Sequence, residues 1–437
     1  MSSAARTTRR GFLKGAALGA LAAPYLVSAS ALGLEGRPAA SDRITTGHVG
    51  VGGRGGYLLD ACLSTSESQV VAVCDTDTGR RERARGAVDK RYAAERERGA
   101  YGGCDTHTDF RDLVARRDLD AVVVATPDHW HALVTIAAVK AGKDVYCEKP
   151  LAGTVGEGRA VVQAVRRYGR VLQTGSHERS TASCRLACEL VQNGRVGKLQ
   201  TVRVQLPTEN NQCPPQPPQP VPEGFDYDMW LGPRPWEPYT PKRCHGVFRW
   251  ILDYSDGELT DRGAHVGDIA MWGAGPFLEG PAEIEGTGVF PRDGLWNTPI
   301  AFNITHTYAN GVRLECVSEG QRGVRFQGTD GWIFVHIHGG ALEAEPRSIL
   351  HETIGPGEVH LKRSPGHHND FLSCVRDRTD PVAHAEAGHA AASFCHLGLI
   401  ALQTGKKLRW DPKEEKFLNS DEANRMIWRP MRSPWRL

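Results

Sequence analysis

Short apolar segments alternate with longer segments of helical periodicity along the first half of the chain. The apolar segments are rich in valine and predict strands at residues 43–49, 69–74, 121–125, 144–147 and 170–173. Helical patterns lie between them, among them residues 132–141 and 156–168. Because short buried strands that alternate with helices form parallel sheets, this half predicts an α/β fold with a doubly wound parallel sheet.

A glycine-rich loop follows the first predicted strand and precedes helical residues. In such a loop the first glycine permits a tight turn, the second lets the backbone approach a pyrophosphate, and the third allows close helix packing. An ordinary turn is the alternative interpretation. The context favours a dinucleotide-binding loop made of Gly50, Gly52, Gly53, Arg54 and Gly55.

Asp75 stands at the end of the second predicted strand. A carboxylate at this place hydrogen-bonds the hydroxyls of the adenosine ribose and repels a 2′-phosphate. The sequence therefore predicts NAD as the cofactor, with NADP less favoured. Arg80 and Arg81 lie close by in the sequence and keep NADP open.

Polar residues also follow two later strands of the predicted sheet. The carboxyl ends of parallel strands face the ligand crevice, so we expect these residues to line the cofactor. A lysine held there can hydrogen-bond a substrate hydroxyl and stabilise its developing negative charge. An ordinary surface lysine after a strand is the alternative. The residues are Thr126, Pro127 and His131 after one strand, and Glu148, Lys149 and Pro150 after the next.

Asp261 and His265 are four residues apart, and Asp268 follows three residues later. This spacing predicts one face of a single helix. A histidine titrates near neutrality and can accept a hydroxyl proton, and a carboxylate one turn away can orient it. A metal site is the alternative, but no cysteine or histidine cluster in the sequence completes one, so we expect no metal.

These motifs and their order resemble the Gfo/Idh/MocA family of glucose–fructose oxidoreductases and inositol dehydrogenases. The resemblance spans nearly all of the chain after its first segment. It implies that Lys149, Asp261 and His265 form the catalytic group. It also implies that a C-terminal α+β domain with an open, mostly antiparallel sheet follows the Rossmann domain. Members usually assemble through that sheet, so we expect a homo-oligomer. Arg262 and Val266 differ from the Trp and His that exported members commonly carry.

Aromatic residues are frequent between residues 230 and 254. Sugars bind against aromatic faces with polar groups at the rim, so His245, Arg249 and Tyr254 are candidate substrate contacts. Packing in a hydrophobic core explains the aromatic residues equally well.

The first 31 residues have the pattern of a twin-arginine export signal. Thr8-Arg9-Arg10-Gly11-Phe12-Leu13-Lys14 precedes an uncharged stretch, and Ala29-Ser30-Ala31 is typical of a cleavage site. The stretch is too short and too rich in glycine and alanine for a permanent membrane span. We therefore expect the protein to be exported in folded form, with its cofactor already bound, to a periplasmic or other extracytoplasmic location.

The predicted organisation is a signal peptide at 1–31, an NAD-binding Rossmann domain at 42–175, and a substrate-binding and oligomerisation domain at 176–437 with a C-terminal extension. Lys and Arg number 53 against 51 Asp and Glu, which gives no indication of a nucleic-acid or membrane-surface partner. The 11 cysteines lack paired spacing, so no disulfide framework is expected.

Two enzymatic functions fit this sequence. The first is an NAD-dependent oxidoreductase that acts on a secondary alcohol of a sugar or polyol, with a tightly bound and internally recycled cofactor. The alternative is an NAD-dependent enzyme that cleaves glycosides by transient oxidation, elimination and re-reduction. A cofactor-binding sensor without catalysis is disfavoured by the complete set of Lys149, Asp261 and His265.

Overall fold

The structure is a computed structural model that describes residues 43–280 and 282–437, and its strands there form two sheets. The segment predicted to be an export signal lies outside the described residues. Within the described part of the chain, no helix has the length and apolar character needed to cross a membrane.

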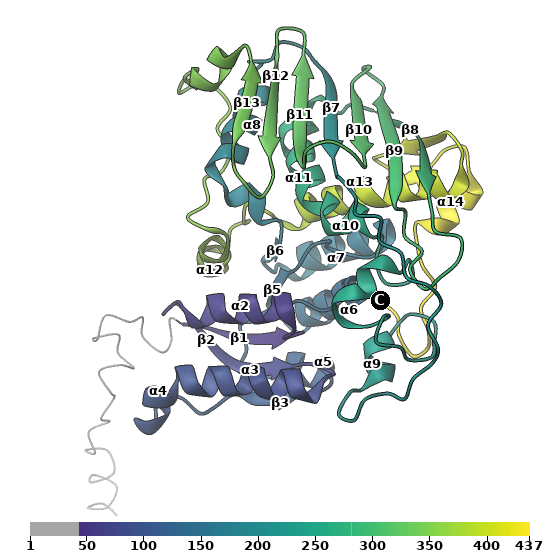
Figure 1. Ribbon diagram of the computed structural model, residues 1–437. Helices are drawn as coiled ribbons and strands as arrows, with labels where there is room; N and C mark the ends of the chain where they lie inside the picture. The colour runs from purple at the N-terminus through teal and green to yellow at the C-terminus, as the bar shows by residue number, and fades with distance from the viewer. Residues whose placement is uncertain (1–42, 281) are drawn as a thin grey trace, which may run out of the picture. The chain divides into compact units, whose positions relative to one another are not determined.

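The first sheet is parallel throughout and has the strand order β3-β2-β1-β4-β5-β6 (Figure 1). The order reverses between β1 and β4, and ligands of doubly wound sheets bind at the carboxyl ends of the strands beside such a reversal. The strands are β1 (Ile44–Val49), β2 (Ser68–Cys74), β3 (Asp105–His107), β4 (Ala121–Val124), β5 (Asp144–Cys147) and β6 (Leu172–Thr174).

Helices cover both faces of this sheet, so β4 and β5 are buried along their whole length. One hydrophobic cluster joins the sheet to α5 (Phe110–Val114), α6 (Asp128–Lys140) and α7 (Val155–Tyr168). A second joins it to α2 (Gly53–Leu63), α3 (Thr78–Arg91) and α12 (His367–Asp377). The short α4 (Ala93–Glu97) follows α3.

The second sheet is mixed and mostly antiparallel, with the order β13-β12-β11-β7-β10-β9-β8-β14-β15. Its parallel pair is β7 with β10. The strands are β7 (Leu199–Gln205), β8 (Ala282–Val289), β9 (Ala301–Tyr308), β10 (Arg313–Val317), β11 (Gly323–Gly328), β12 (Trp332–His336), β13 (Leu342–Glu345), β14 (Leu408–Asp411) and β15 (Lys416–Phe417).

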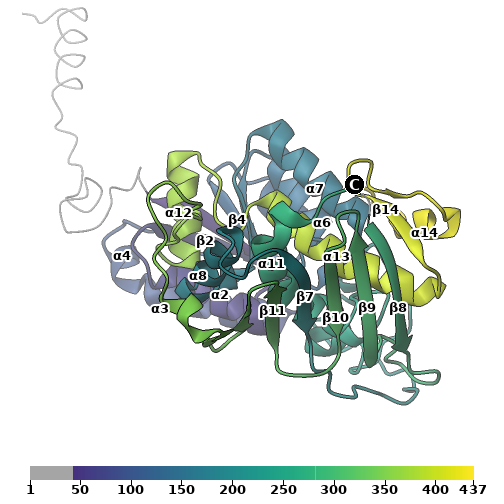
Figure 2. The same cartoon turned by 90° about the horizontal axis from the view of Figure 1, so that it is seen from above.

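One face of the second sheet packs against α8 (Ala182–Gln192), α11 (Gly263–Ala274) and α13 (Ala385–Thr404), which share a hydrophobic core with its strands. Helix α13 also contacts α7 of the first sheet, so α11 and α13 lie between the two sheets (Figures 1 and 2). The remaining helices are α9 (Tyr227–Leu231), α10 (Glu258–Asp261), α14 (Asp421–Met426) and the 3-10 turns η2 (His177–Ser180), η3 (His245–Trp250), η4 (Gly275–Phe277) and η5 (Arg347–His351).

The C-terminal segment returns from the second sheet to the helices of the first. The Trp435 ring packs edge-on against Trp130 of α6, with ring centroids 4.7 Å apart. Arg429 donates a 2.7 Å hydrogen bond to the buried Asp256 carboxylate, which also contacts His396 of α13 at 2.6 Å. The last residues therefore connect elements that lie far apart in the sequence.

The predicted fold class is confirmed: a doubly wound parallel sheet is followed by a mostly antiparallel one. Two differences from the sequence prediction of the first sheet are larger than a shift of one residue at a strand end. The edge strand β3 was not expected, because its three residues Asp-Thr-His carry no apolar pattern. Strand β6 begins at Leu172 and not at residue 170. All 11 cysteines lie within the described residues, where each is buried and none forms a disulfide.

Candidate active site

A cavity of about 420 Å³ opens at the carboxyl ends of the parallel strands. Its polar lining includes nearly all of the residues singled out from the sequence. They are Gly50, Gly52, Gly53, Arg54, Gly55, Asp75, Thr126, Pro127, His131, Glu148, Lys149, His245, Arg249, Asp261 and His265. The structure thus brings the glycine loop and the Asp-x-x-x-His motif to one cavity, although about 200 residues of sequence separate them.

The glycine loop has the backbone geometry that a pyrophosphate cradle needs. Gly50 adopts a φ of +82°, a conformation that side-chain-bearing residues rarely adopt. A Cβ atom on Gly55 would lie 1.9 Å from the Gly50 carbonyl oxygen, so only glycine allows α2 to approach the turn this closely. Helix α2 begins without a side-chain cap and without an acidic residue in its first turn. Its N-terminus is therefore suited to an anionic ligand.

Asp75 lies at the end of β2, as predicted, and lines the cavity. Its carboxylate accepts hydrogen bonds from the backbone N–H groups of Val51 (2.9 Å) and Asp77 (3.0 Å), which fix its orientation. Burial raises the pKa of Asp75 and outweighs these hydrogen bonds. Each carboxylate oxygen keeps a lone pair for a ribose hydroxyl. Arg80 also lines the cavity, whereas the side chain of Arg81 is bonded to the Asp75 carbonyl oxygen at 2.6 Å.

His131 connects the two segments that follow β4 and β5. Its Nδ1 lies 2.6 Å from the Pro150 carbonyl oxygen and its Nε2 lies 2.9 Å from the Thr126 carbonyl oxygen. Glu148 accepts a 2.7 Å hydrogen bond from Arg54 Nε and a 3.2 Å bond from the Lys149 backbone N–H. These contacts fix the backbone on both sides of Lys149.

Lys149 is anchored to Asp261 through two hydrogen bonds. Its Nζ donates to the Asp261 carbonyl oxygen at 2.6 Å and to Oδ1 at 2.8 Å. The carbonyl is free to accept because the helix is interrupted at Arg262: the backbone N–H of His265 donates to the Arg262 carbonyl oxygen instead. The irregular turn thereby supplies an acceptor that a continuous helix would have used internally.

This interruption corrects the prediction of a single helix for the Asp261 to Asp268 segment. Asp261 ends α10, whereas His265 and Asp268 belong to α11. Asp268 is fully buried and accepts hydrogen bonds from Arg179 at 2.7–2.9 Å. It therefore pairs with Arg179 and is not part of the cavity lining.

Asp261 is held in its charged form by two cations. Burial would raise its pKa, but the charges of Lys149 and Arg249 outweigh burial and lower the pKa well below its ordinary value. Arg249 Nε lies 3.3 Å from Asp261 Oδ1. A carboxylate with both partners in place stays ionised at neutral pH and keeps the lysine ammonium in one position.

His265 has the environment of a neutral imidazole. Its ring is buried, and burial, followed by the positive charge of Lys149, lowers its pKa well below 6.5. Its Nδ1 has no hydrogen-bond partner among the described residues. A neutral imidazole that lines a cavity can accept a proton from a ligand there.

The three candidate substrate contacts have different outcomes. His245 and Arg249 line the cavity. Tyr254 does not: it is completely buried in an aromatic cluster, where Arg243 Nη1 lies 3.3 Å from its hydroxyl oxygen. Placing Tyr254 among the substrate contacts was therefore wrong. Its neighbours Trp230 and Phe248 belong to the same hydrophobic cluster and also line the cavity.

The sequence prediction missed other residues of the site. His177 lines the cavity and stands three residues after the end of β6, so its place after a parallel strand could have revealed it. Glu178 and His338 lie beside His177. No spacing in the sequence indicates that His338 belongs to this site. The apolar lining residues Phe110, Met229, Trp230 and Phe248 lie outside any motif.

Two family profiles match this sequence. Residues 44–176 match the NAD-binding Rossmann fold of the Gfo/Idh/MocA oxidoreductase family, and residues 211–437 match the C-terminal alpha/beta domain of the same family. The chain belongs to the Gfo/Idh/MocA oxidoreductase family. NAD is therefore the cofactor of the first domain, in agreement with the glycine loop and Asp75.

Individual relatives cover only parts of the chain. A 1,5-anhydro-D-fructose reductase of Ensifer adhaerens is 42% identical over 97 residues, which are 22% of this chain and 29% of the reductase. A glycosyl hydrolase family 109 protein of Solibacter usitatus is 36% identical over 156 residues, 35% of each chain. The matched segment is thus about a third of the length of these relatives.

The fold is also similar to that of solved structures. An aldose–aldose oxidoreductase from Caulobacter crescentus, crystallised with glycerol, superimposes with a TM-score of 0.59 at 19% identity. The match covers 84% of this chain and 99% of the Caulobacter chain. An NAD-binding protein from Listeria innocua matches over 84% of this chain and 96% of its own. At 19% identity the similarity establishes the fold only. The activity has to be inferred from the residues of the site.

Proposed function

We propose that the protein is an NAD-dependent oxidoreductase that oxidises a secondary alcohol of a sugar or polyol. The observation that carries this proposal is the assembly of Lys149, Asp261 and His265 in the cavity that begins at the glycine loop. The shared family places the chain among oxidoreductases, and the residues of the cavity supply the groups that alcohol oxidation needs.

Each residue has a distinct task in this proposal. The glycine loop and Asp75 would hold NAD, which would supply the hydride acceptor for the alcohol carbon. His265 accepts the hydroxyl proton, because its imidazole is neutral and its ring lines the cavity. Lys149 hydrogen-bonds the same oxygen and stabilises the negative charge that develops on it. Asp261 is a positioning residue that holds the ammonium group through its carbonyl and carboxylate oxygens.

We further propose that the cofactor stays bound and is recycled within one closed cycle. The export signal predicted at residues 1–31 supports this, since a periplasmic enzyme has no soluble cofactor pool to draw from. The name of the Caulobacter protein, an aldose–aldose oxidoreductase, describes an enzyme that couples two sugars. We also propose that the protein assembles into a homo-oligomer through its second sheet.

A second candidate function is glycoside cleavage by transient oxidation, elimination and re-reduction. The match to a glycosyl hydrolase family 109 protein favours it. The same three residues serve this reaction, because its first step is the same oxidation. After oxidation, the acidified neighbouring C–H bond would be broken and the glycosidic substituent would leave.

The two candidates are separated by incubating the purified, cofactor-loaded protein with sugars and glycosides without added NAD. Continuous glycoside cleavage in D₂O, with deuterium entering next to the oxidised carbon, would identify the elimination route. Turnover that requires a second, oxidised sugar would identify coupled oxidation and reduction. A requirement for free NAD in every turnover would contradict the closed cycle in both forms.

A further inference from the structure

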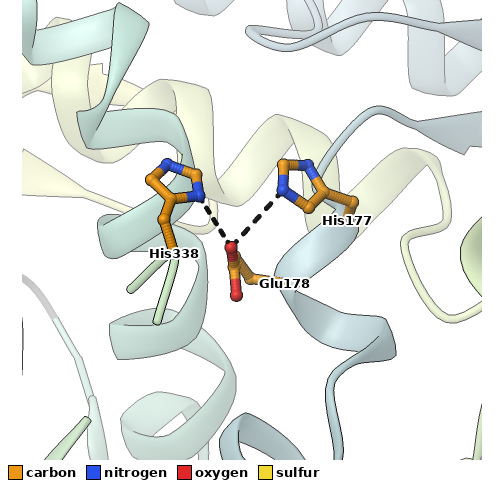
Figure 3. Close-up of side chains that lie close together, drawn as sticks. All are labelled: His177, Glu178 and His338. Atoms are coloured by element: carbon orange, nitrogen blue, oxygen red, sulfur yellow. Dashed lines mark ion pairs between the residues drawn. The ribbon is translucent and has the colours of Figure 1, made fainter. Parts of the chain in front are cut away.

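A cluster of two histidines and one glutamate lies beside the candidate active site and has no part in the chemistry described above. His177 and Glu178 belong to η2, directly after the last strand of the parallel sheet, whereas His338 comes from the turn between β12 and β13. Figure 3 shows the Glu178 carboxylate between the two imidazole rings. Within residues 43–280 and 282–437, this is the one group of three such side chains whose donor atoms all lie within 4.8 Å of one another.

The distances fit a small divalent cation. The Glu178 Oε1 atom lies 3.4 Å from His177 Nε2 and 2.9 Å from His338 Nδ1. Zinc bonds of ~2.0–2.1 Å at tetrahedral angles place neighbouring ligand atoms ~3.3–3.4 Å apart. The cluster therefore needs only small side-chain movements to surround one ion, and two nitrogens with one carboxylate oxygen are ligands that zinc accepts.

The electrostatics of the cluster also favour a cation. Glu178 is only 3% exposed. Its carboxylate contacts His177 and His338, and both contacts come from the imidazole nitrogens. Buried carboxylates in proteins are paired with positive charge or coordinate a metal ion.

The ring of His265 completes the surroundings. Its centroid lies 4.7 Å from that of His177 and 5.0 Å from that of His338, and its Nδ1 is buried without a partner. His177 itself lines the cavity. The cluster thus adjoins an unsatisfied polar group and borders the cavity through His177.

We propose that His177, Glu178 and His338 bind one divalent cation of the zinc class at the edge of the candidate active site. Three protein ligands leave a coordination position for a water molecule or a ligand oxygen, as in catalytic zinc sites. No sequence motif predicts this metal site, because its ligands come from two distant segments. Use of the free position by a sugar oxygen rests on the function proposed above; metal binding itself does not.

The alternative to a metal site is a hydrogen-bonded network in which Glu178 accepts from both histidines. Direct measurements of metal binding distinguish this network from a metal site. The full chain is treated with a chelator, dialysed into metal-free buffer, and titrated with Zn²⁺ and Co²⁺ in a calorimeter, in the absence of NAD and substrate. We expect one equivalent to bind, and the visible absorption of the Co²⁺ form to report nitrogen and oxygen ligands.

The variant His338→Asn removes one ligand and keeps the local backbone. His338 has a φ of +65°, and asparagine tolerates this left-handed conformation better than most residues. We expect the affinity of His338→Asn and of Glu178→Gln to fall by about a hundredfold or more, since even changes outside the ligand shell cost about 10–100-fold. Unchanged thermal unfolding of His338→Asn in chelator shows that its fold is intact.

The matched control is His336→Asn. His336 lies two residues away on β12 and pairs with Glu343 at 2.6 Å, so it is a histidine–carboxylate pair without a third ligand. It should bind the metal like the unaltered chain. Binding of less than a tenth of an equivalent, or equal affinity in the control and in His338→Asn, would overturn the proposal. Because no cofactor or substrate is present, that outcome would leave the proposed oxidoreductase function standing.

Discussion

Replacing Gly55 by alanine would place a methyl group 1.9 Å from the carbonyl oxygen of Gly50, a separation far below the 3.0 Å at which real Cβ atoms essentially stop. The obstructing atom belongs to the backbone, so no side-chain rotation relieves the contact. Either the Gly50 turn or the start of α2 must move. Both elements form the predicted pyrophosphate cradle, and the substitution therefore tests the cofactor site and the helix packing together.

Gly56 provides a control within the same helix turn. A Cβ atom there meets nothing within 4 Å. Both substitutions gain the helix propensity of alanine over glycine, about 1 kcal/mol, so this gain cancels when the two variants are compared. What remains is the cost of the clash, about 3 kcal/mol at the upper end for overpacking, because the backbone cannot give way cheaply.

The two variants are compared by urea unfolding and by calorimetric titration with NAD. We expect Gly56→Ala to be slightly more stable than the unaltered chain and to bind NAD equally well. Gly55→Ala should be about 3 kcal/mol less stable than Gly56→Ala and should bind NAD at least about tenfold more weakly, which corresponds to 1.4 kcal/mol. Equal stability and equal affinity of the two variants would refute the close approach of helix and turn.

Two further predictions concern the catalytic group and the core. Lys149→Ala and His265→Ala should each bind NAD normally yet reduce it with substrate about a hundredfold more slowly or worse, because the first loses the group that stabilises the developing negative charge and the second loses the base. Single-turnover absorbance measurements check this, and normal rates would remove the residue from the mechanism. His306 is buried beside Phe394, and burial lowers its pKa to about 3. Below pH 6.5 this histidine is therefore protonated in the unfolded chain but not in the folded chain. The free energy of unfolding consequently falls as the pH decreases. Relative to the unaltered chain, His306→Leu should therefore gain about 1.4 kcal/mol in unfolding free energy between pH 7.5 and 5.5; urea unfolding at both values measures it, and an equal change in both proteins would contradict the assignment.

Much of the first sheet could be predicted because its signals are local. Valine-rich strands and the glycine loop are read from neighbouring residues, and strand β5 agrees with the prediction at both ends. Strand β3 was not predicted, because this short edge strand is stabilised by pairing with β2 and has no apolar pattern of its own. The glycine loop, Asp75, Thr126, Pro127, His131, Glu148 and Lys149, which follow parallel strands, all line the cavity.

The parts of the site that were missed depend on contacts between distant segments. His338 reaches Glu178 only because the β12–β13 turn lies next to η2, and no local pattern encodes that proximity. Tyr254 was misplaced for the opposite reason: an aromatic residue near the site has the same sequence signature whether it faces a ligand or a core. The break at Arg262 was equally hidden, since the spacing of Asp261 and His265 suits a continuous helix.

That break has a consequence for how the site can be studied by mutagenesis. Half of the Lys149 anchor is a peptide carbonyl, which every amino acid at position 261 provides. Alanine scanning would remove the Asp261 carboxylate and leave this acceptor in place, so it would undervalue the position. Replacement of the peptide bond after residue 261 by an ester would leave a weaker carbonyl acceptor without altering any side chain. Lys149 is thus held partly by a backbone carbonyl, which no substitution of a side chain can remove.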